Sequence, residues 1–299
     1  MLYDKILDEI RVRTMDYNLC DINTVEQLLK KNGFKFSKAL GQNFIIDENV
    51  CPNMAAALDA DKNTGVIEIG AGIGVLTKEL CKVAKRVVSI ELDKRLYPVL
   101  EETLGDFDNF ELVEGDVLKI DLEELIGEKF GDCESVKVCA NLPYYITSPV
   151  IMRLLEVQLK IDEIVVMVQK EAAERLTAKL GTRESGAISA AVQYRGEAER
   201  LFEVGRECYL PSPKVDSEVI KIRLYSEPVY SVESEKDFFN LIRAAFAQRR
   251  KTLVNSVSST LGIPKKKLET ALYELGLDNS VRAEKLTMED FVKLNEYLK

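Results

Sequence analysis

The chain has 299 residues, which is enough for one large domain and a smaller second one. Hydrophobic residues make up 46% of it and charged residues 30%, a balance typical of proteins that fold in water. There is no histidine, which excludes a Ser-His-Asp triad, a histidine general base and a histidine-ligated metal. None of the 6 cysteines forms a C-x-x-C pair, so we expect reduced thiols and no metal site.

The sequence shows no sign of a membrane or secretory segment. No apolar run is long enough to cross a bilayer, so we expect no transmembrane helix. Residues 1–17 are charged throughout and lack the apolar stretch of a signal peptide. We therefore expect a cytoplasmic protein.

The net charge of −9, taken alone, argues against a nucleic-acid partner. Its distribution changes that interpretation, because residues 226–299 carry 12 Lys and Arg against 11 Asp and Glu, whereas the first 225 residues carry a net −10. The positive side chains of the tail cluster at positions 243, 249–251 and 265–267. Local patches, rather than global charge, bind phosphate groups.

The N-terminal third of the chain begins with a short predicted helix. Thr24 and the three residues after it match a capping box, and Gly33 is a typical helix terminator. Residues 1–33 are therefore expected to form an N-terminal helical extension. The following segment, residues 34–43, is basic and contains glycine.

From Thr64 onward, the pattern alternates between strand and helix. Buried strands are expected at 66–69, 86–90, 110–113, 136–140 and 164–168, with helices between them, one of them ending at Val83 and another spanning 170–180. A closing pair of strands is expected at 198–204 and 217–224. This order predicts an α/β, Rossmann-like fold whose sheet is mostly parallel, with a C-terminal antiparallel strand.

After Tyr225 the spacing of apolar residues becomes helical, from Phe238 to Val257, and two further helices are expected at 267–275 and 288–298. A domain boundary near Glu227 and Pro228 would give a catalytic domain at 34–226 and a small all-helical C-terminal domain at 227–299.

A glycine-rich turn directly follows the first expected strand. It has the pattern G-x-G-x-G, with Gly70, Gly72 and Gly74, where the backbone can approach a ligand closely. Glu91 stands 21 residues after Gly70 and can accept hydrogen bonds from both hydroxyls of a ribose. Asp116 follows the third strand and can accept from an adenine amino group. These features resemble the class I S-adenosylmethionine-dependent methyltransferases.

The fourth strand runs into Asn141, Leu142, Pro143 and Tyr144. This stretch resembles the (Asn/Asp/Ser)-Pro-Pro-(Tyr/Phe) signature of amino-group methyltransferases. The Asn141 side-chain oxygen and the Leu142 carbonyl can accept the two hydrogens of an exocyclic amine, which localises the lone pair of its nitrogen. Proline stiffens the turn, and the tyrosine ring offers a stacking face worth roughly 1–3 kcal/mol. No strong base is needed, which agrees with the absence of histidine.

Together these motifs resemble the ribosomal RNA adenine dimethyltransferases, over residues 34–299. The motifs that carry the resemblance are the 38–47 segment with Gly41-Gln42-Asn43-Phe44-Ile45, the 68–72 turn, the 90–93 and 115–116 strand ends, Asn141 to Tyr144, the 169–171 segment and the 211–217 segment. Within the family, the chain is most similar to the small-subunit enzymes.

The resemblance implies a substrate, a cofactor and their contacts. It implies dimethylation of two adjacent adenosines in the 3′-terminal hairpin loop of 16S rRNA, within a maturing small ribosomal subunit, with S-adenosylmethionine as methyl donor. Loop adenosines are unpaired, which makes them easier to extrude. Tyr209 stands where the family commonly has a phenylalanine beside the target base. The cofactor contacts expected are Asn43, Ile45, Gly70, Gly72, Glu91, Leu92, Asp116, Val117 and Asn141.

The basic residues Arg243, Arg249, Arg250 and Lys251 are candidates for RNA phosphate contacts, with Arg243 and Arg250 seven apart on one face of an expected helix. Three alternatives remain: a large-subunit rRNA dimethyltransferase that confers antibiotic resistance, a ribosome-assembly checkpoint factor with methylation secondary, and a DNA adenine methyltransferase. Nothing in the sequence requires more than a monomer.

Overall fold

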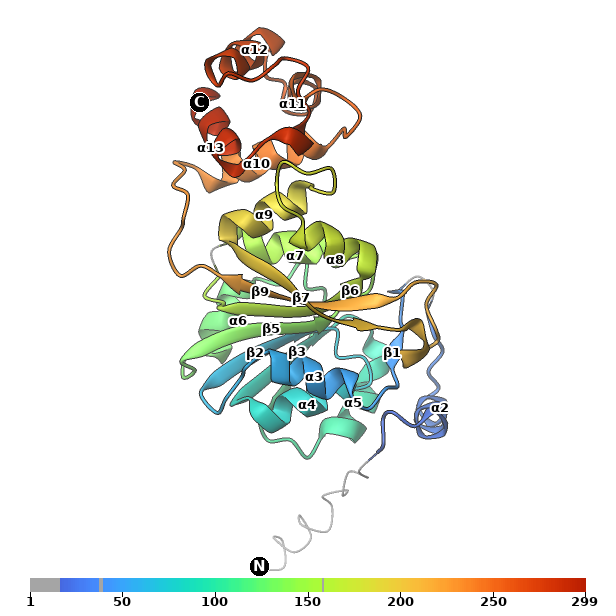
Figure 1. Ribbon diagram of the computed structural model, residues 1–299. Helices are drawn as coiled ribbons and strands as arrows, with labels where there is room; N and C mark the ends of the chain where they lie inside the picture. Colours follow the sequence, from blue (N-terminus) through green and yellow to red (C-terminus); the bar gives the residue numbers. More distant parts are fainter. Residues whose placement is uncertain (1–16, 38–39, 158) are drawn as a thin grey trace, which may run out of the picture. The chain divides into compact units, whose positions relative to one another are not determined.

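The computed structural model of the chain describes residues 17–37, 40–157 and 159–299. Within them, seven strands form one sheet in the order β4-β3-β2-β5-β6-β9-β7 (Figure 1). The strands are β2 (Thr64–Ile69), β3 (Arg86–Glu91), β4 (Phe110–Glu114), β5 (Ser135–Asn141), β6 (Glu163–Gln169), β7 (Gly196–Val204) and β9 (Ser217–Leu224). The mostly parallel sheet with a C-terminal antiparallel strand is confirmed, since β2 pairs in parallel with β3 and β5 whereas β9 runs antiparallel to β6.

The chain divides into two compact units. The first contains the described residues up to 143 together with Val204–Asp216, and the second contains Tyr144–Glu203 and Ser217–Lys299. Of the predicted extension at 1–33, residues 1–16 lie outside the described residues, as do positions 38 and 39 of the predicted 38–47 motif.

The first unit is built around β2, all six residues of which are buried. A strand buried on both faces carries apolar residues without alternation, which explains why Val66, Ile67 and Ile69 show no alternating pattern. The helices of this unit are α2 (Ile22–Lys31), α3 (Val50–Ala57), α4 (Val75–Val83), α5 (Tyr97–Leu104) and α6 (Leu122–Lys129), with short 3-10 turns η2 (Lys94–Leu96) and η3 (Arg206–Cys208).

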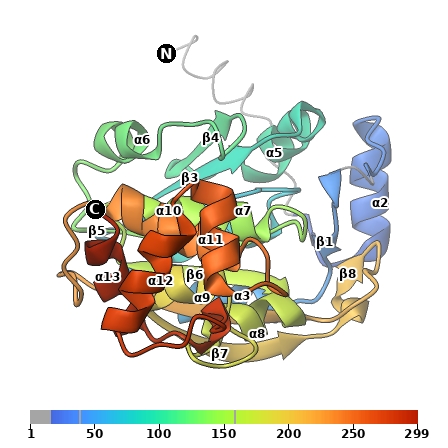
Figure 2. The ribbon, with the colours of Figure 1, turned by 90° about the horizontal axis from the view of Figure 1, so that it is seen from above.

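A two-stranded antiparallel ribbon, β1 (Phe44–Ile45) with β8 (Tyr209–Leu210), completes the first unit. The α2 helix lies beside this ribbon (Figure 2), and its Leu28 and Leu29 share an apolar cluster with Phe44. The capping box predicted at Thr24 is wrong. Asp21 is the N-cap, because its carboxylate accepts hydrogen bonds from the Thr24 backbone and hydroxyl at 2.8 and 2.7 Å.

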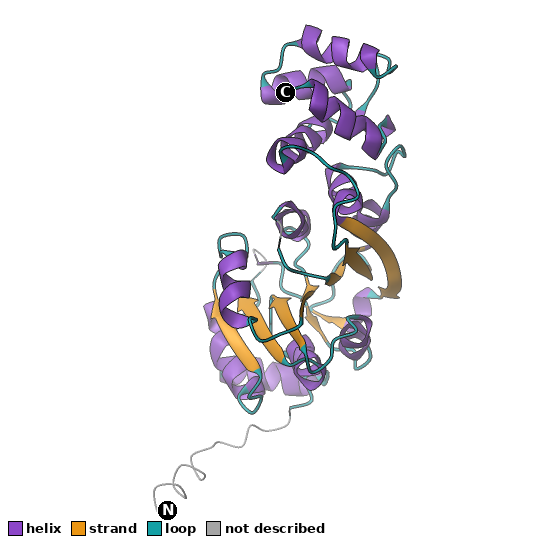
Figure 3. Ribbon diagram, turned by 90° about the vertical axis from the view of Figure 1, so that its left-hand side faces the viewer, coloured by secondary structure: helices purple, strands orange, loops and turns teal. Residues whose placement is uncertain are grey.

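The second unit combines the antiparallel pair β6–β9 with helices. They are α7 (Thr147–Glu156), α8 (Lys170–Thr177), α9 (Ala187–Arg195), α10 (Glu235–Phe246), α11 (Leu253–Leu261), α12 (Lys265–Glu274) and α13 (Met288–Tyr297), with a 3-10 turn η4 (Ala283–Lys285). From Glu235 on, the regular structure is helical (Figure 3). The buried rings of Tyr194, Phe238 and Phe239 join α9 to α10, and Arg195 forms an ion pair with Glu235 at 2.6 Å.

Two predicted helices end earlier than their patterns indicated. The helix predicted at 170–180 stops at Thr177. The helical spacing from Phe238 to Val257 is split by a turn, because α10 ends at Phe246 and Thr252 caps a new helix by accepting from the Asn255 backbone at 3.3 Å.

Candidate active site

The glycine-rich turn joins β2 to α4. Gly70, Gly72 and Gly74 have φ values of +82°, +58° and +92°, which side chains with a Cβ rarely adopt. Apart from its chain neighbours, no atom of the described residues lies within 4 Å of the position that a Cβ on Gly70 would occupy, whereas a Cβ on Gly72 would lie 3.4 Å from the Phe44 ring. The turn therefore leaves its backbone open at Gly70 and is covered by an aromatic ring at Gly72.

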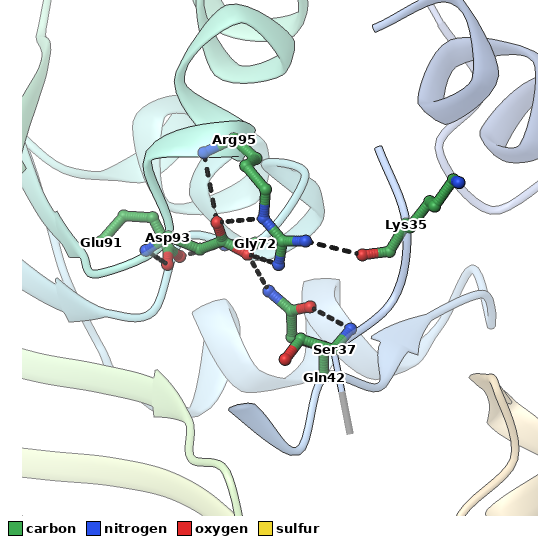
Figure 4. Close-up of polar contacts among 7 residues, drawn as sticks. All are labelled: Lys35, Ser37, Gln42, Gly72, Glu91, Asp93 and Arg95. Carbon is green, nitrogen blue, oxygen red and sulfur yellow. Dashed lines mark hydrogen bonds and ion pairs between the residues drawn. The ribbon is translucent and has the colours of Figure 1, made fainter. Parts of the chain in front are cut away.

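Glu91 ends β3, and its carboxylate is directed at this turn. One carboxylate oxygen accepts from the backbone N–H of Gly72 at 3.0 Å, and the other accepts from the backbone N–H of Asp93 at 2.8 Å (Figure 4). The residue is only 7% exposed, and burial raises the pKa of Glu91, although these two hydrogen bonds favour its ionised form. The Glu91 carboxylate is thus held in place by the backbone N–H groups of Gly72 and Asp93.

Asp116 follows β4 after Gly115, whose N–H donates to the Glu91 carbonyl at 2.9 Å. The Asp116 carboxylate accepts from the backbone N–H of Leu118 at 3.0 Å, and its other oxygen lies 3.6 Å from the Lys119 ammonium. Since β4, β3 and β2 are parallel neighbours, the ends that carry Gly70, Glu91 and Asp116 meet at one edge of the sheet. Next to them, Leu92 is 49% exposed whereas Val117 is buried.

Asn141 ends β5, the neighbour of β2 on its other side. Its side-chain N–H donates to the Asn43 carbonyl at 3.4 Å, and the Asn43 side chain donates to the Gly41 carbonyl at 3.1 Å. The structure therefore brings these two asparagines together, although 98 residues separate them. Leu142 is buried and Pro143 half-buried.

Tyr209 lies on β8 and is only 3% exposed. The register of the ribbon pairs it with Ile45, and the Ile46 N–H donates to the Cys208 carbonyl at 2.8 Å. The Tyr209 ring is therefore packed inside the protein, beside the segment that carries Asn43 and Ile45. A base could reach its face only after neighbouring atoms moved.

The second unit begins with the two tyrosines of the Asn-Leu-Pro-Tyr-Tyr stretch. Tyr144 is half-buried, and its hydroxyl lies 2.9 Å from the Ser217 hydroxyl at the start of β9. Tyr145 is 54% exposed. The sequence pattern identified the tyrosine after the proline, but it gave no indication that a serine 73 residues later would fix the position of its ring.

The sequence motifs included Gln42, Glu68 and Asp93, but sequence reasoning assigned them no role in holding the predicted site in place. Gln42 and Arg95 both donate to the Asp93 carboxylate. Glu68 lies under the glycine-rich turn, fully buried, and accepts from Thr77 and Ser89 at 2.7 and 2.5 Å. The sequence indicated only that these polar residues lie within stretches that are otherwise apolar or that carry a motif.

The predicted basic helix is wrong in its geometry. Arg243 lies on α10 and forms an ion pair with Glu156. Because α10 ends at Phe246, Arg249, Arg250 and Lys251 lie in the following turn, so Arg243 and Arg250 share no helix face. Arg249 donates to the carbonyls of residues 183 and 185 at 2.9 and 3.3 Å, and Arg250 and Lys251 are exposed.

The described residues contain no group of three or more Cys, Asp or Glu side chains placed to hold a metal ion. Nor does any helix in the described ranges have the length and apolarity that crossing a membrane requires.

Solved structures with this architecture define the class. A 23S rRNA methyltransferase, ErmE, superposes with a TM-score of 0.61 and 25% identity, covering 85% of this chain and 99% of that one. A dimethyladenosine transferase from Plasmodium falciparum gives a TM-score of 0.66 and 26% identity, over 84% and 95% of the two chains. The fold is that of the class I S-adenosylmethionine-dependent methyltransferases, as predicted.

Sequence comparison narrows the class to one family. The model of the family described as ribosomal RNA adenine dimethylase matches residues 33–299, and the chain belongs to that family. A protein of Bacillus licheniformis named ribosomal RNA small subunit methyltransferase A is 45% identical over 277 residues, which cover 92% of this chain and 95% of that one. The protein of the same name from Bacillus pumilus is 46% identical over 276 residues, or 91% and 94% of the two chains.

Proposed function

We propose that this enzyme transfers methyl groups from S-adenosylmethionine to N6 of two adjacent adenosines in the 3′-terminal hairpin loop of 16S rRNA, giving N6,N6-dimethyladenosine during ribosome biogenesis. The observation that carries the proposal is the contact between Asn141 and Asn43 at the sheet edge where Glu91 faces the glycine-rich turn. This contact places the Asn141 amide, which is suited to binding an amine, beside groups that are suited to binding a nucleoside cofactor. We expect the enzyme to act as a cytoplasmic monomer on a maturing small subunit.

The residues of the first unit fit S-adenosylmethionine. The open position at Gly70 leaves room for a ligand against the turn, and Glu91 retains lone pairs for ribose hydroxyls while its backbone partners hold it. The exposed Leu92 and the buried Val117 would contact the adenine. The Asp116 carboxylate would accept a hydrogen bond from the amino group of that adenine. Asn43, Ile45, Gly72 and Asn141 would complete the contacts. When bound, the cofactor supplies an electrophilic methyl group on its sulfonium.

The chain's own contribution is to position the target amine. The Asn141 side-chain oxygen and the Leu142 carbonyl would accept its two hydrogens, which localises the nitrogen lone pair for attack. Pro143 restricts the turn because its φ is fixed and it has no N–H. The Tyr144 ring, held through Ser217, would stack on the base, and Tyr209 would support the segment around Ile45. Positioning of this kind is the main contribution that an enzyme makes to a direct displacement.

The names of the similar proteins favour the small subunit over the large one. The relatives at 45% and 46% identity are named as small-subunit enzymes, whereas the 23S rRNA enzyme shares only 25% identity.

The exposed Arg250 and Lys251 would contact phosphates, with Arg249 holding the neighbouring loop and Arg243 playing a smaller part because Glu156 already pairs with it.

The experiment that tests this proposal supplies labelled S-adenosylmethionine, the protein and small ribosomal subunits from cells that lack the dimethylation. Large subunits from ordinary cells are treated in parallel, and the labelled nucleosides are identified by mass. Label in N6,N6-dimethyladenosine of the small-subunit 3′ hairpin is the expected result. Label confined to the large subunit would move the assignment to the 23S rRNA. Cofactor binding without label in either subunit would contradict the catalytic proposal and favour an assembly role.

A further inference from the structure

We propose that Asp93 is a positioning residue that clamps residues 35–37 and 42–43 beside the glycine-rich turn and thereby sets the affinity for the cofactor. The inference rests on the proposed function, since it assumes that the cofactor binds between this turn and Glu91. It concerns a residue that follows the predicted ribose acid by two positions and that need not itself touch a ligand.

The Asp93 carboxylate is the centre of a network of side-chain donors (Figure 4). Arg95 donates to its two oxygens at 2.8 and 2.5 Å, and Gln42 donates at 2.7 Å. The Asp93 side chain is only 5% exposed, and its bonds to Arg95 hold the pKa of Asp93 below its ordinary value. The carboxylate therefore stays charged at neutral pH, and hydrogen bonds to a charged acceptor are the stronger kind.

The same residue also holds Glu91. The backbone N–H of Asp93 donates to a Glu91 carboxylate oxygen at 2.8 Å, while the other oxygen accepts from Gly72. Asp93 thus fixes the predicted ribose acid through its backbone and Gln42 through its side chain. Because Gln42 directly precedes Asn43, the clamp links two sets of predicted cofactor contacts that lie far apart in the sequence.

The clamped segment is fastened at its other end as well. Arg95 donates to the Lys35 carbonyl at 3.0 Å and lies over the Phe34 ring, with 5.0 Å between its guanidinium carbon and the ring centroid. The Ser37 N–H donates to the Gln42 side-chain oxygen at 3.1 Å. The Phe36 and Phe44 rings pack with 5.3 Å between centroids, and Phe44 covers Gly72. Loss of the hydrogen bonds of Asp93 would therefore loosen the packing of the Phe44 ring against Gly72.

The test uses variants that break the clamp by different means. Gln42→Ala removes one donor and leaves the turn-capping bond of Asp93 to the Arg95 N–H intact, so it is less disruptive than Asp93→Asn. Gln42→Glu keeps the size of the side chain but places a second carboxylate against Asp93. Gln27→Ala, an exposed glutamine on α2, is the matched control. The affinity for S-adenosylhomocysteine is measured by calorimetry, at several pH values for Gln42→Glu.

A second readout needs neither cofactor nor activity. The chain contains no tryptophan, so Phe36→Trp introduces a single tryptophan at a position 40% exposed in the aromatic cluster. Acrylamide quenching of this tryptophan reports how firmly the segment is held. We expect Gln42→Ala and Asp93→Asn to increase the quenching and to weaken S-adenosylhomocysteine binding about tenfold, the order of one charge-assisted hydrogen bond. The control should change neither.

Gln42→Glu should bind as weakly as Gln42→Ala at pH 8 and approach the wild-type affinity near pH 5, because two adjacent carboxyls can share a proton. Increased quenching with unchanged affinity would overturn the positioning role, and unchanged quenching would overturn the clamp. Either result leaves the proposed function standing, since the wild type would still bind and methylate. A wild-type chain that binds no S-adenosylhomocysteine would overturn both.

Discussion

Ile45 and Tyr209 are antiparallel partners on a two-stranded ribbon, and each is 3% exposed. One of them belongs to the segment predicted to contact the cofactor, and the other was predicted to lie beside the target base. Tyr209, which is 164 positions from Ile45 in the sequence, therefore pairs with the segment predicted to contact the cofactor. The pairing predicts that the proposed contacts to the cofactor and to the target base depend on the same ribbon.

Replacement of Tyr209 tests this dependence. Tyr209→Ala should destabilise the protein by about 3–5 kcal/mol, as the loss of a buried aromatic ring usually does, and should also weaken S-adenosylhomocysteine binding. Tyr209→Phe keeps the ring and should retain most of the affinity. Calorimetry and thermal unfolding measure the two effects. Tyr194→Ala, which removes an equally buried ring in the second unit, is the control for destabilisation alone. Equal affinities in wild type and Tyr209→Ala would contradict the coupling.

Tyr144 should act on the RNA step and not on the cofactor. Tyr144→Ala removes a stacking face worth roughly 1–3 kcal/mol, so kcat/KM for ribosomal subunits should fall about 10- to 100-fold with cofactor affinity unchanged. Tyr144→Phe keeps the face and loses the contact of the hydroxyl with Ser217. Methyl transfer under limiting RNA measures the effect.

Ser217→Ala is the matched control for Tyr144→Phe, because it removes the same hydrogen bond from the other side. If both variants are nearly as active as the wild type, the ring carries the effect. If both are as impaired as Tyr144→Ala, the hydroxyl pair matters more than stacking. An active Tyr144→Ala would remove the tyrosine from the mechanism and strengthen a pure assembly role.

Arg249 and Arg250 lie in the turn after α10 and should contribute to RNA binding in different ways. Arg250→Ala should weaken binding to small subunits and reduce the slope of log affinity against log salt by about 1, without a change in melting temperature. Arg249→Ala should weaken binding and also lower the melting temperature, because Arg249 holds the carbonyls of residues 183 and 185. Lys293→Ala, an exposed cation on α13, serves as the control. Equal salt slopes for Arg250→Ala and wild type would exclude a phosphate contact.

The parts of the site that lie at strand ends could be predicted from the sequence. The buried strands are rich in apolar residues, and Glu91 and Asn141 end two of them, so their meeting at one sheet edge needed only the rule for parallel strands. The contacts that hold them could not be predicted. Gln42 and Asp93 are 51 residues apart, and nothing in either neighbourhood marks them as partners.

The errors have equally specific causes. Both Asp21 and Thr24 are good helix caps, and the pattern could not decide which one begins the helix. The residues at 247–251 are mostly good helix formers, so local preference favours one continuous helix. Tertiary and capping contacts decide otherwise, as the bonds of Arg249 to its neighbouring loop and of Thr252 to Asn255 show.

Glu68 provides a test of the buried layer beneath the glycine-rich turn. It is fully buried, one of its oxygens accepts from Thr77 and Ser89, and among the described contacts its other oxygen has no hydrogen-bond partner. Burial raises the pKa of Glu68 from 4.5 to about 7. The folded protein therefore binds a proton at this site over a pH range in which the unfolded chain has already lost it.

The sign of the pH dependence follows from this difference. Between pH 4.5 and about 7 the folded state holds more protons than the unfolded state, so this group makes the protein less stable as the pH rises through that range, by up to about 3 kcal/mol. Glu68→Gln cannot titrate and should remove this part of the slope. Urea unfolding of both proteins at pH 5, 6, 7 and 8 measures it, and the chain has no histidine that would titrate in this range. Glu26→Gln, at an exposed position on α2, is the control. Parallel stability curves for wild type and Glu68→Gln would show that the buried acid keeps the same proton occupancy in the folded and unfolded chain.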